Sequence, residues 1–169
     1  MKKNLVLVGM MAVGKTTLGK IVAKKQELKF IDIDASIEKK NSMTIKEIFK
    51  KKGEKFFRME EEKEVLKSLE KNNCVIALGG GAFMNKTLRE NILKKAISIW
   101  LNIDIKILSK RVKWTQKRPL LKEENKQKKI TELYANRKNI YKLANHKIAC
   151  DNLSKGDIAE KIIALYEKY

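Results

Sequence analysis

The feature that most constrains the fold is an eight-residue segment that directly follows a short apolar run. Asn4 to Val8 is almost continuously apolar, which is typical of a strand buried on both faces of a parallel sheet. Gly9 to Thr16 then matches G-x-x-x-x-G-K-[ST], the pattern of a phosphate-binding P-loop when it joins a strand to a helix. The sequence therefore predicts a nucleotide site between this strand and the next helix.

Each position of the loop has an expected task. The two glycines can adopt backbone angles closed to other residues, so that successive amide groups turn toward phosphate oxygens. The lysine is expected to bridge the β and γ phosphates of ATP, and the first threonine to ligate Mg²⁺. The residues predicted to bind the nucleotide are Gly9, Ala12, Val13, Gly14, Lys15, Thr16 and Thr17.

Four more short apolar runs alternate with helical patterns, which predicts an α/β three-layer sandwich with a five-stranded parallel sheet. No linker or internal repeat divides the chain, so residues 1–169 are interpreted as one domain. The further strands are expected at Phe30–Ile33, Cys74–Leu78, Ala96–Leu101 and Lys147–Cys150. The helices are expected at Lys15–Gln26, Asp34–Asn41, Thr44 to Gly53, Glu54–Lys71, Asp104–Val112, Lys126–Leu143 and Lys155–Lys168.

The net charge of +19 comes almost entirely from lysine. Such a charge is typical of proteins that bind nucleic acid, but these lysines are spread over every predicted helix and loop, with no aromatic-interleaved basic segment. We interpret them as solvated surface charge and expect no nucleic-acid partner. Arginine is scarce, which indicates positions where a planar guanidinium is needed for a carboxylate or phosphate. The arginines are Arg58, Arg89, Arg111, Arg118 and Arg137.

Nothing in the sequence predicts a membrane segment or an oxidising compartment. Leu5 to Val8 is too short to span a bilayer. Cys74 and Cys150 have neither metal-site spacing nor a disulfide framework. A composition of 43% hydrophobic and 35% charged residues is that of a globular protein. We expect a monomer in the cytoplasm, without a membrane partner.

Two aspartates end the second predicted strand, beside the P-loop. Asp32 and Asp34 alternate there with isoleucines, and active sites of open parallel sheets lie beyond the carboxyl ends of their strands. Asp32 is expected on the Mg²⁺ side, acting through water. Asp34 is expected to orient the acceptor hydroxyl and accept its proton. The alternative is that Asp34 only caps the helix that follows.

Three of the arginines lie in parts of the sequence that could bring them to the active site. Phe56 and Phe57 precede Arg58 and could anchor its backbone, although a surface position is the alternative. Arg118 lies in a polar stretch, residues 113–125, which is expected to form a mobile lid over the phosphates. Arg137 lies in the helix behind that stretch.

At these residues the chain resembles the shikimate kinase family almost from end to end. The motifs occur in the order and spacing of that family, and together they are highly specific. They are the P-loop, Phe30-x-Asp32-x-Asp34-x-x-Ile37-Glu38, Gly53-Glu54-x-x-Phe57-Arg58, Gly79-Gly80-Gly81, Arg118-Pro119-Leu120-Leu121 and Arg137-x-x-x-Tyr141. The sequence departs from the family pattern at Ala12, where glycine is common.

The resemblance implies a fold like that of nucleoside monophosphate kinases and transfer of the γ-phosphate of ATP to the 3-hydroxyl of shikimate. It implies that Asp34 binds the substrate hydroxyls, that Arg58 and Arg137 bind its carboxylate, and that the glycine loop lies at its ring. It also places Arg118 on the transferring phosphate and Arg111 near adenine. The implied substrate-binding residues are Asp34, Arg58, Gly79, Gly80, Gly81, Arg118 and Arg137, and the implied catalytic residues are Lys15, Asp34 and Arg118.

Two other functions stay open at this point. One is a P-loop kinase for gluconate, another small hydroxy acid or a nucleoside monophosphate, although paired arginines argue against a neutral acceptor. The other is a nucleic-acid-associated P-loop ATPase, which only the net charge favours.

Overall fold

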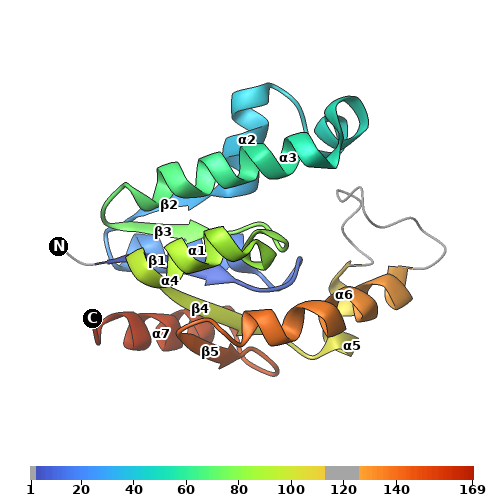
Figure 1. Cartoon of the computed structure of the whole chain (residues 1–169). Coiled ribbons are helices and arrows are strands. Elements are labelled where there is room, and N and C mark those ends of the chain that lie inside the picture. The colour runs from blue at the N-terminus through green and yellow to red at the C-terminus, as the bar shows by residue number, and fades with distance from the viewer. Residues whose placement is uncertain (1–2, 113–125) are drawn as a thin grey trace.

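The computed structural model describes residues 3–112 and 126–169. A single sheet of five parallel strands runs through this part of the chain, in the order β2-β3-β1-β4-β5 (Figure 1). The strands are β1 (Asn4–Val8), β2 (Lys29–Asp32), β3 (Cys74–Ala77), β4 (Ala96–Asn102) and β5 (His146–Ala149).

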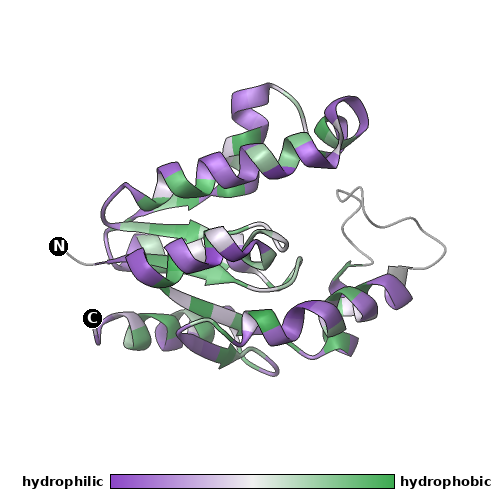
Figure 2. Ribbon diagram, in the orientation of Figure 1, coloured by the Kyte–Doolittle hydropathy of each residue, from purple (hydrophilic) through white to green (hydrophobic). Residues whose placement is uncertain are grey.

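The central strands form the core because their apolar runs have no polar face to present to water. All residues of β1 and β3 are buried, and so are the first six of β4. In Figure 2 the strands are therefore mainly hydrophobic, whereas the helices carry their hydrophilic residues on the outside. The edge strand β2 is only partly buried.

Helices cover both faces of the sheet and complete the expected three layers. Helix α1 packs on β2 and β3 and against α7, while α4 packs on β4 and against α3 (Figure 1). The predicted α/β fold is confirmed. The helical segments are α1 (Lys15–Lys25), α2 (Ile33–Asn41), α3 (Ile45–Leu69), the 3-10 turn η1 (Ala82–Met84), α4 (Lys86–Lys95), α5 (Ile105–Val112), α6 (Lys126–Tyr141) and α7 (Lys155–Tyr166).

The boundary between β2 and α2 differs from the prediction. Ile33 is the first helical residue and not the last residue of the strand. Asp32 stops the strand because its side chain caps the helix, with Oδ1 accepting a hydrogen bond of 3.1 Å from the Ala35 N–H. Asp34 lies in the first turn instead, so the alternative of Asp34 as the cap is wrong. Strand β5 also begins and ends one residue earlier than expected.

Helix α3 contains a break where the sequence predicted an end. A capping box of Thr44 and Glu47 opens the helix, with hydrogen bonds in both directions. Gly53 then has φ 82° and ψ 170°, outside any helical conformation, but the chain resumes a helix at once. In Figure 1 the short first part of α3 consequently runs in a different direction from the long second part.

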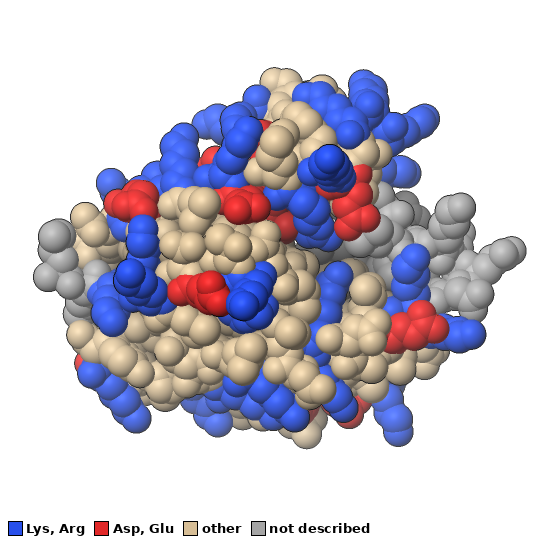
Figure 3. Space-filling model, in the orientation of Figure 1, with Lys and Arg blue, Asp and Glu red and all other residues tan. Residues whose placement is uncertain are grey.

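Charged side chains are distributed over the surface between areas of uncharged residues. Lysine and arginine side chains are scattered over the face shown in Figure 3, without one continuous basic stripe. None of the helices in the described ranges combines the length and the apolar character that crossing a membrane requires.

Candidate active site

The P-loop follows β1, which is buried between β3 and β4 and therefore fixes where the loop begins. Gly9 has φ +142°, and a Cβ there would lie 2.6 Å from the carbonyl oxygen of Leu101. Gly14 has φ +105° and precedes the first turn of α1. Only glycine fits the first position, and both help to turn the backbone amides inward at the helix N-terminus, which favours anions.

Lys15 lies folded over the loop. Its side chain is buried, and its Nζ donates to the carbonyl oxygens of Gly9 at 2.8 Å and Met10 at 2.7 Å. The ammonium group is thereby held at the point where the loop encloses its phosphate space. The geometry suits a lysine that contacts phosphate oxygens as a point charge.

The backbone of Ala12 has a conformation that residues other than glycine rarely adopt. Its φ is 60°, in the left-handed region that favours glycine. Ala12 therefore holds a left-handed conformation at a cost in strain.

Thr16 and Asp32 come together beside the loop. The Thr16 hydroxyl donates to Asp32 Oδ2 at 2.6 Å, while the other carboxylate oxygen caps α2. Two hard oxygen ligands thus lie side by side, as Mg²⁺ prefers. No group of three or more His, Cys, Asp or Glu side chains in residues 3–112 and 126–169 is arranged to hold a metal ion. A metal here would thus depend on phosphate and water oxygens for most of its ligands.

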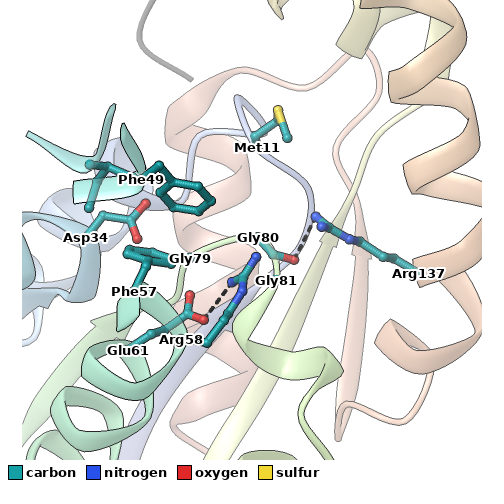
Figure 4. Close-up of a pocket in the computed structure, with 11 residues that line it drawn as sticks. Met11, Asp34, Phe49, Phe57, Arg58, Glu61, Gly79, Gly80, Gly81 and Arg137 are labelled. Carbon is teal, nitrogen blue, oxygen red and sulfur yellow. Dashed lines mark hydrogen bonds and ion pairs between the residues drawn. The ribbon is translucent and has the colours of Figure 1, made fainter. Parts of the chain in front are cut away.

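A hollow that is partly open to solvent lies next to the P-loop. Figure 4 shows that its polar groups come from three sides: the start of α2, the second part of α3 and α6. The lining residues are Met11, Asp34, Ile45, Phe49, Phe57, Arg58, Glu61, Gly79, Gly80, Gly81 and Arg137.

Arg58 is held in place by two carboxylates of its own helix. Its Nη1 donates to Glu61 Oε2 at 2.7 Å, and its Nη2 lies 3.2 Å from Glu54 Oε1. The guanidinium also lies over the ring of Phe57, 5.2 Å from its centroid. Burial lowers the pKa of Arg58, but the charges and hydrogen bonds of Glu61 and Glu54 together outweigh burial, so the pKa is raised overall.

Arg137 reaches the same place from α6. Its Nη1 donates to the carbonyl oxygen of Gly80 at 3.2 Å, and the buried hydroxyl of Tyr141, one helical turn later, donates to the same oxygen. The Tyr141 ring stacks on Trp100 of β4, with centroids 5.9 Å apart. Helix α6 and β4 together therefore fix the position of the glycine loop.

The three glycines leave space that a side chain would otherwise take, most tightly at Gly79 and Gly81. A Cβ on Gly81 would lie 2.7 Å from Arg58 Nη1, and a Cβ on Gly80 would lie 3.4 Å from the Met11 amide nitrogen. A Cβ on Gly79 would lie 2.6 Å from Glu61 Oε1 and 2.9 Å from Asp34 Oδ1. Side chains of α2, α3 and α6 and the P-loop backbone all converge on this loop.

The structure brings most of the predicted site residues together. The P-loop residues, Asp32, Asp34, Arg58, the glycine loop and Arg137 line one continuous region at the carboxyl ends of β1, β2 and β3. Thr17 is exposed in the first turn of α1 and Val13 is buried under the loop. Arg111 is exposed near the end of α5. Arg118 and the expected lid, residues 113–125, lie outside the described residues.

Several contributors were missed in the sequence. Glu61 is three residues after Arg58, a spacing at which helical side chains meet and which could have identified the pair. Ile45 and Phe49 are four residues apart and offer the same signal for an apolar wall. Arg89 is partly buried and donates to the carbonyl oxygens of Phe83 at 3.0 Å and Met84 at 3.2 Å, so that it braces the turn after the glycine loop.

Comparison with known proteins agrees with this geometry. The family model described as Shikimate kinase matches residues 11–167. The shikimate kinase of Sulfurihydrogenibium sp. (strain YO3AOP1) is 40% identical over 95% of this chain and 96% of its own length. That of Thermodesulfovibrio yellowstonii is also 40% identical, over 98% of this chain and 96% of its own length. The structure of shikimate kinase from Acinetobacter baumannii in complex with shikimate superimposes with a TM-score of 0.95 at 32% identity, covering 99% of this chain and 94% of that one.

Proposed function

Since this chain belongs to the shikimate kinase family and transfers the γ-phosphate of ATP to the 3-hydroxyl of shikimate, we propose roles for the residues around its P-loop and glycine loop. One observation carries these roles. The guanidinium groups of Arg58 and Arg137 and the carboxylate of Asp34 line one hollow beside the phosphate-binding loop. A substrate with a carboxylate at one end and hydroxyls at the other matches that distribution of charge.

Arg58 and Arg137 hold the substrate carboxylate. Their planar guanidinium groups can each offer two parallel N–H donors, which fit a carboxylate better than a lysine does. Support comes from their approach to the glycine loop from opposite elements, α3 and α6. Gly79, Gly80 and Gly81 lie along the substrate ring and exclude any side chain from the space that it occupies.

Asp34 binds the substrate hydroxyls at the other end of the hollow. It orients the 3-hydroxyl toward the P-loop and accepts its proton as the phosphoryl group arrives. A loose transition state needs little help from a base, so that positioning supplies most of the effect.

The P-loop holds ATP through the backbone amides between Gly9 and Thr17 and through Lys15. Lys15 leaves its carbonyl partners to contact the β and γ phosphates, where positive charge offsets the charge of the transferring group. Arg118 supplies a second positive charge from the expected lid, residues 113–125, and Arg111 lies near adenine. Both of these roles rest on the family resemblance.

Mg²⁺ is proposed at Thr16 and Asp32. The Thr16 hydroxyl would ligate the ion directly and Asp32 would hold one of its waters, which the contact between the two side chains supports. When bound, the ion neutralises charge on the β and γ phosphates.

We further propose that residues 1–169 act as a single-domain monomer in the cytoplasm. One sheet and one continuous core support the single domain. Cys74 and Cys150 are buried free thiols, which agrees with a reducing compartment.

The roles can be tested by measuring ADP release with Mg²⁺, ATP and one acceptor at a time: shikimate, gluconate, AMP or none. We expect turnover with shikimate alone. Arg58→Lys and Arg137→Lys should each raise KM for shikimate by about 10–100-fold, the worth of one charge-assisted hydrogen bond, and leave KM for ATP nearly unchanged. Lys138→Gln removes an exposed charge beside the clamp and should change neither. Equal losses for both substrates would refute the clamp.

A further inference from the structure

Glu61 is a buried carboxylate with a task beyond holding Arg58. The residue is only 2% exposed. Its Oε2 accepts from Arg58 Nη1 at 2.7 Å, whereas its Oε1 is buried and has no hydrogen-bond partner among the described residues. That second oxygen points at the glycine loop, 2.6 Å from the place a Cβ of Gly79 would take. A buried carboxylate oxygen without a donor disfavours the charged form, so Oε1 is an atom at which a proton can be taken up.

The charged groups that face Glu61 come from three elements. They are Arg58 of its own helix, Asp34 of α2 and Arg137 of α6. The glycine loop and η1 contribute no charged side chain. Inside the hollow two guanidinium groups therefore face two carboxylates, since the Glu54 carboxylate that also contacts Arg58 is exposed to solvent. Burial raises the pKa of Glu61 and the Asp34 charge raises it further, while Arg58 and Arg137 lower it.

Shikimate would add a third carboxylate to this balance. The proposed clamp uses the same guanidinium group of Arg58 that now neutralises Glu61, so that the substrate competes with Glu61 for it. Three carboxylates against two guanidinium groups leave one excess negative charge in a partly dehydrated site. Protonating one carboxylate relieves that charge at lower cost than burying it.

Glu61 is the carboxylate best placed to accept the proton. The substrate-facing carboxylate of Asp34 is required for the hydroxyls, and the substrate's own carboxylate is engaged by both arginines. A proton on Glu61 Oε1 would lie on the side of Glu61 that faces Asp34, because Glu61 Oε1 and Asp34 Oδ1 both lie within 3 Å of the position that a Cβ of Gly79 would take.

We propose that Glu61 takes up one proton from the solvent when the shikimate carboxylate binds Arg58 and Arg137, and releases it when the product leaves. This inference rests on the proposed carboxylate clamp. The step forms one O–H bond on Glu61 at the expense of a buffer acid and breaks no bond in the substrate. Glu61 is thus a positioning residue whose charge state follows the occupancy of the clamp.

Titration calorimetry of wild-type enzyme with shikimate, in buffers of different ionisation enthalpy, measures the proton directly. We expect the observed heat to depend on the buffer near neutral pH, with uptake of up to one proton. Because binding takes up a proton, Kd for shikimate should rise with pH between the free and bound pKa values of Glu61, by up to about tenfold per pH unit. Below the lower and above the upper pKa, Kd should be flat.

The variant Glu61→Gln fixes the neutral form while keeping an oxygen for Arg58. It should bind shikimate without proton uptake, with a Kd that no longer rises with pH and that is lower than the wild-type value at the alkaline end. Glu62→Gln is the matched control, since the Glu62 carboxylate contacts Asn85 at 3.3 Å outside the clamp. It should keep the wild-type proton uptake.

Two results would overturn the inference: buffer-independent heat for wild-type enzyme that binds shikimate, or undiminished proton uptake in Glu61→Gln. The buffer dependence of the wild-type binding heat tests the inference even if Glu61→Gln fails to fold. Failure of the proposed clamp looks different, because shikimate would then give neither binding heat nor the Arg58→Lys effect on KM.

Discussion

Replacing Gly53 with alanine tests whether the break in α3 is imposed by backbone conformation alone. At φ 82° and ψ 170° the residue occupies a region that is almost exclusive to glycine. No atom outside its chain neighbours lies within 4 Å of the position that a Cβ would take. The added methyl group therefore meets no neighbouring side chain, so the change in the free energy of unfolding reports the backbone conformation alone.

The size of the effect follows from two opposing contributions. Holding a non-glycine residue in such a region costs about 1–3 kcal/mol. Alanine also restricts the unfolded chain, which favours folding by about 0.4–1 kcal/mol. The net loss should be about 1–2 kcal/mol, and for a chain of this length the midpoint of thermal unfolding should fall by about 2–8 °C.

Gly156→Ala is the control, because it should change the free energy of unfolding in the opposite direction. Gly156 lies in the first turn of α7, and the nearest atom to its Cβ position is Ser154 Oγ at 3.6 Å. Here alanine fits a regular helix and should stabilise by about 0.5–1 kcal/mol. Urea unfolding followed by circular dichroism gives the free energy of unfolding of both variants, and an unchanged m-value makes the two values comparable. If Gly53→Ala stabilised the protein as well, α3 would be free to straighten and the reasoning would be refuted.

Three further outcomes are expected. Ala12→Gly should leave activity intact and raise the free energy of unfolding, measured in urea, by no more than about 1 kcal/mol. The relief of left-handed strain is offset because glycine gives the unfolded chain more freedom. Tyr141→Phe should cost about 1–2 kcal/mol and raise KM for shikimate in steady-state assays, because the Gly80 carbonyl loses a buried donor while the ring keeps its packing on Trp100. A thiol reagent at pH 8 should leave Cys150 unmodified in the folded protein, as mass spectrometry would show, because burial raises its pKa to about 11; rapid labelling would contradict that burial.

Much of the architecture could be predicted from local patterns. The strands Asn4–Val8 and Ala96–Asn102 are buried on both faces, so their continuous apolar runs are unambiguous. The P-loop motif is equally clear, because its function depends on backbone conformation that only certain residues permit. The family motifs located the arginines and glycines of the hollow by spacing alone.

The errors fall where a local signal has two physical outcomes. Asp32 can extend a strand or cap a helix, and only the contacts with Thr16 and Ala35 decide between them. Gly53 can end a helix or redirect one, which depends on what the chain packs against afterwards. The role of Arg89 follows from backbone carbonyl partners in the folded chain, of which its place in the sequence gives no sign. The three-residue spacing of Arg58 and Glu61 did offer a sign, but it is common in a chain so rich in charged residues.

The order of β2, β3 and β1 in the sheet has a consequence for how such a site can change. Adjacent strands are held about 4.8 Å apart by their hydrogen bonds, and these three end in the aspartates, the glycine loop and the P-loop respectively. The separation between phosphate donor and acceptor is thus set mainly by the spacing of these strand ends. The side chains of α3 and α6 that hold the carboxylate could be exchanged for ones that recognise a different hydroxy acid, while Asp34 and the distance over which the phosphoryl group moves stay the same.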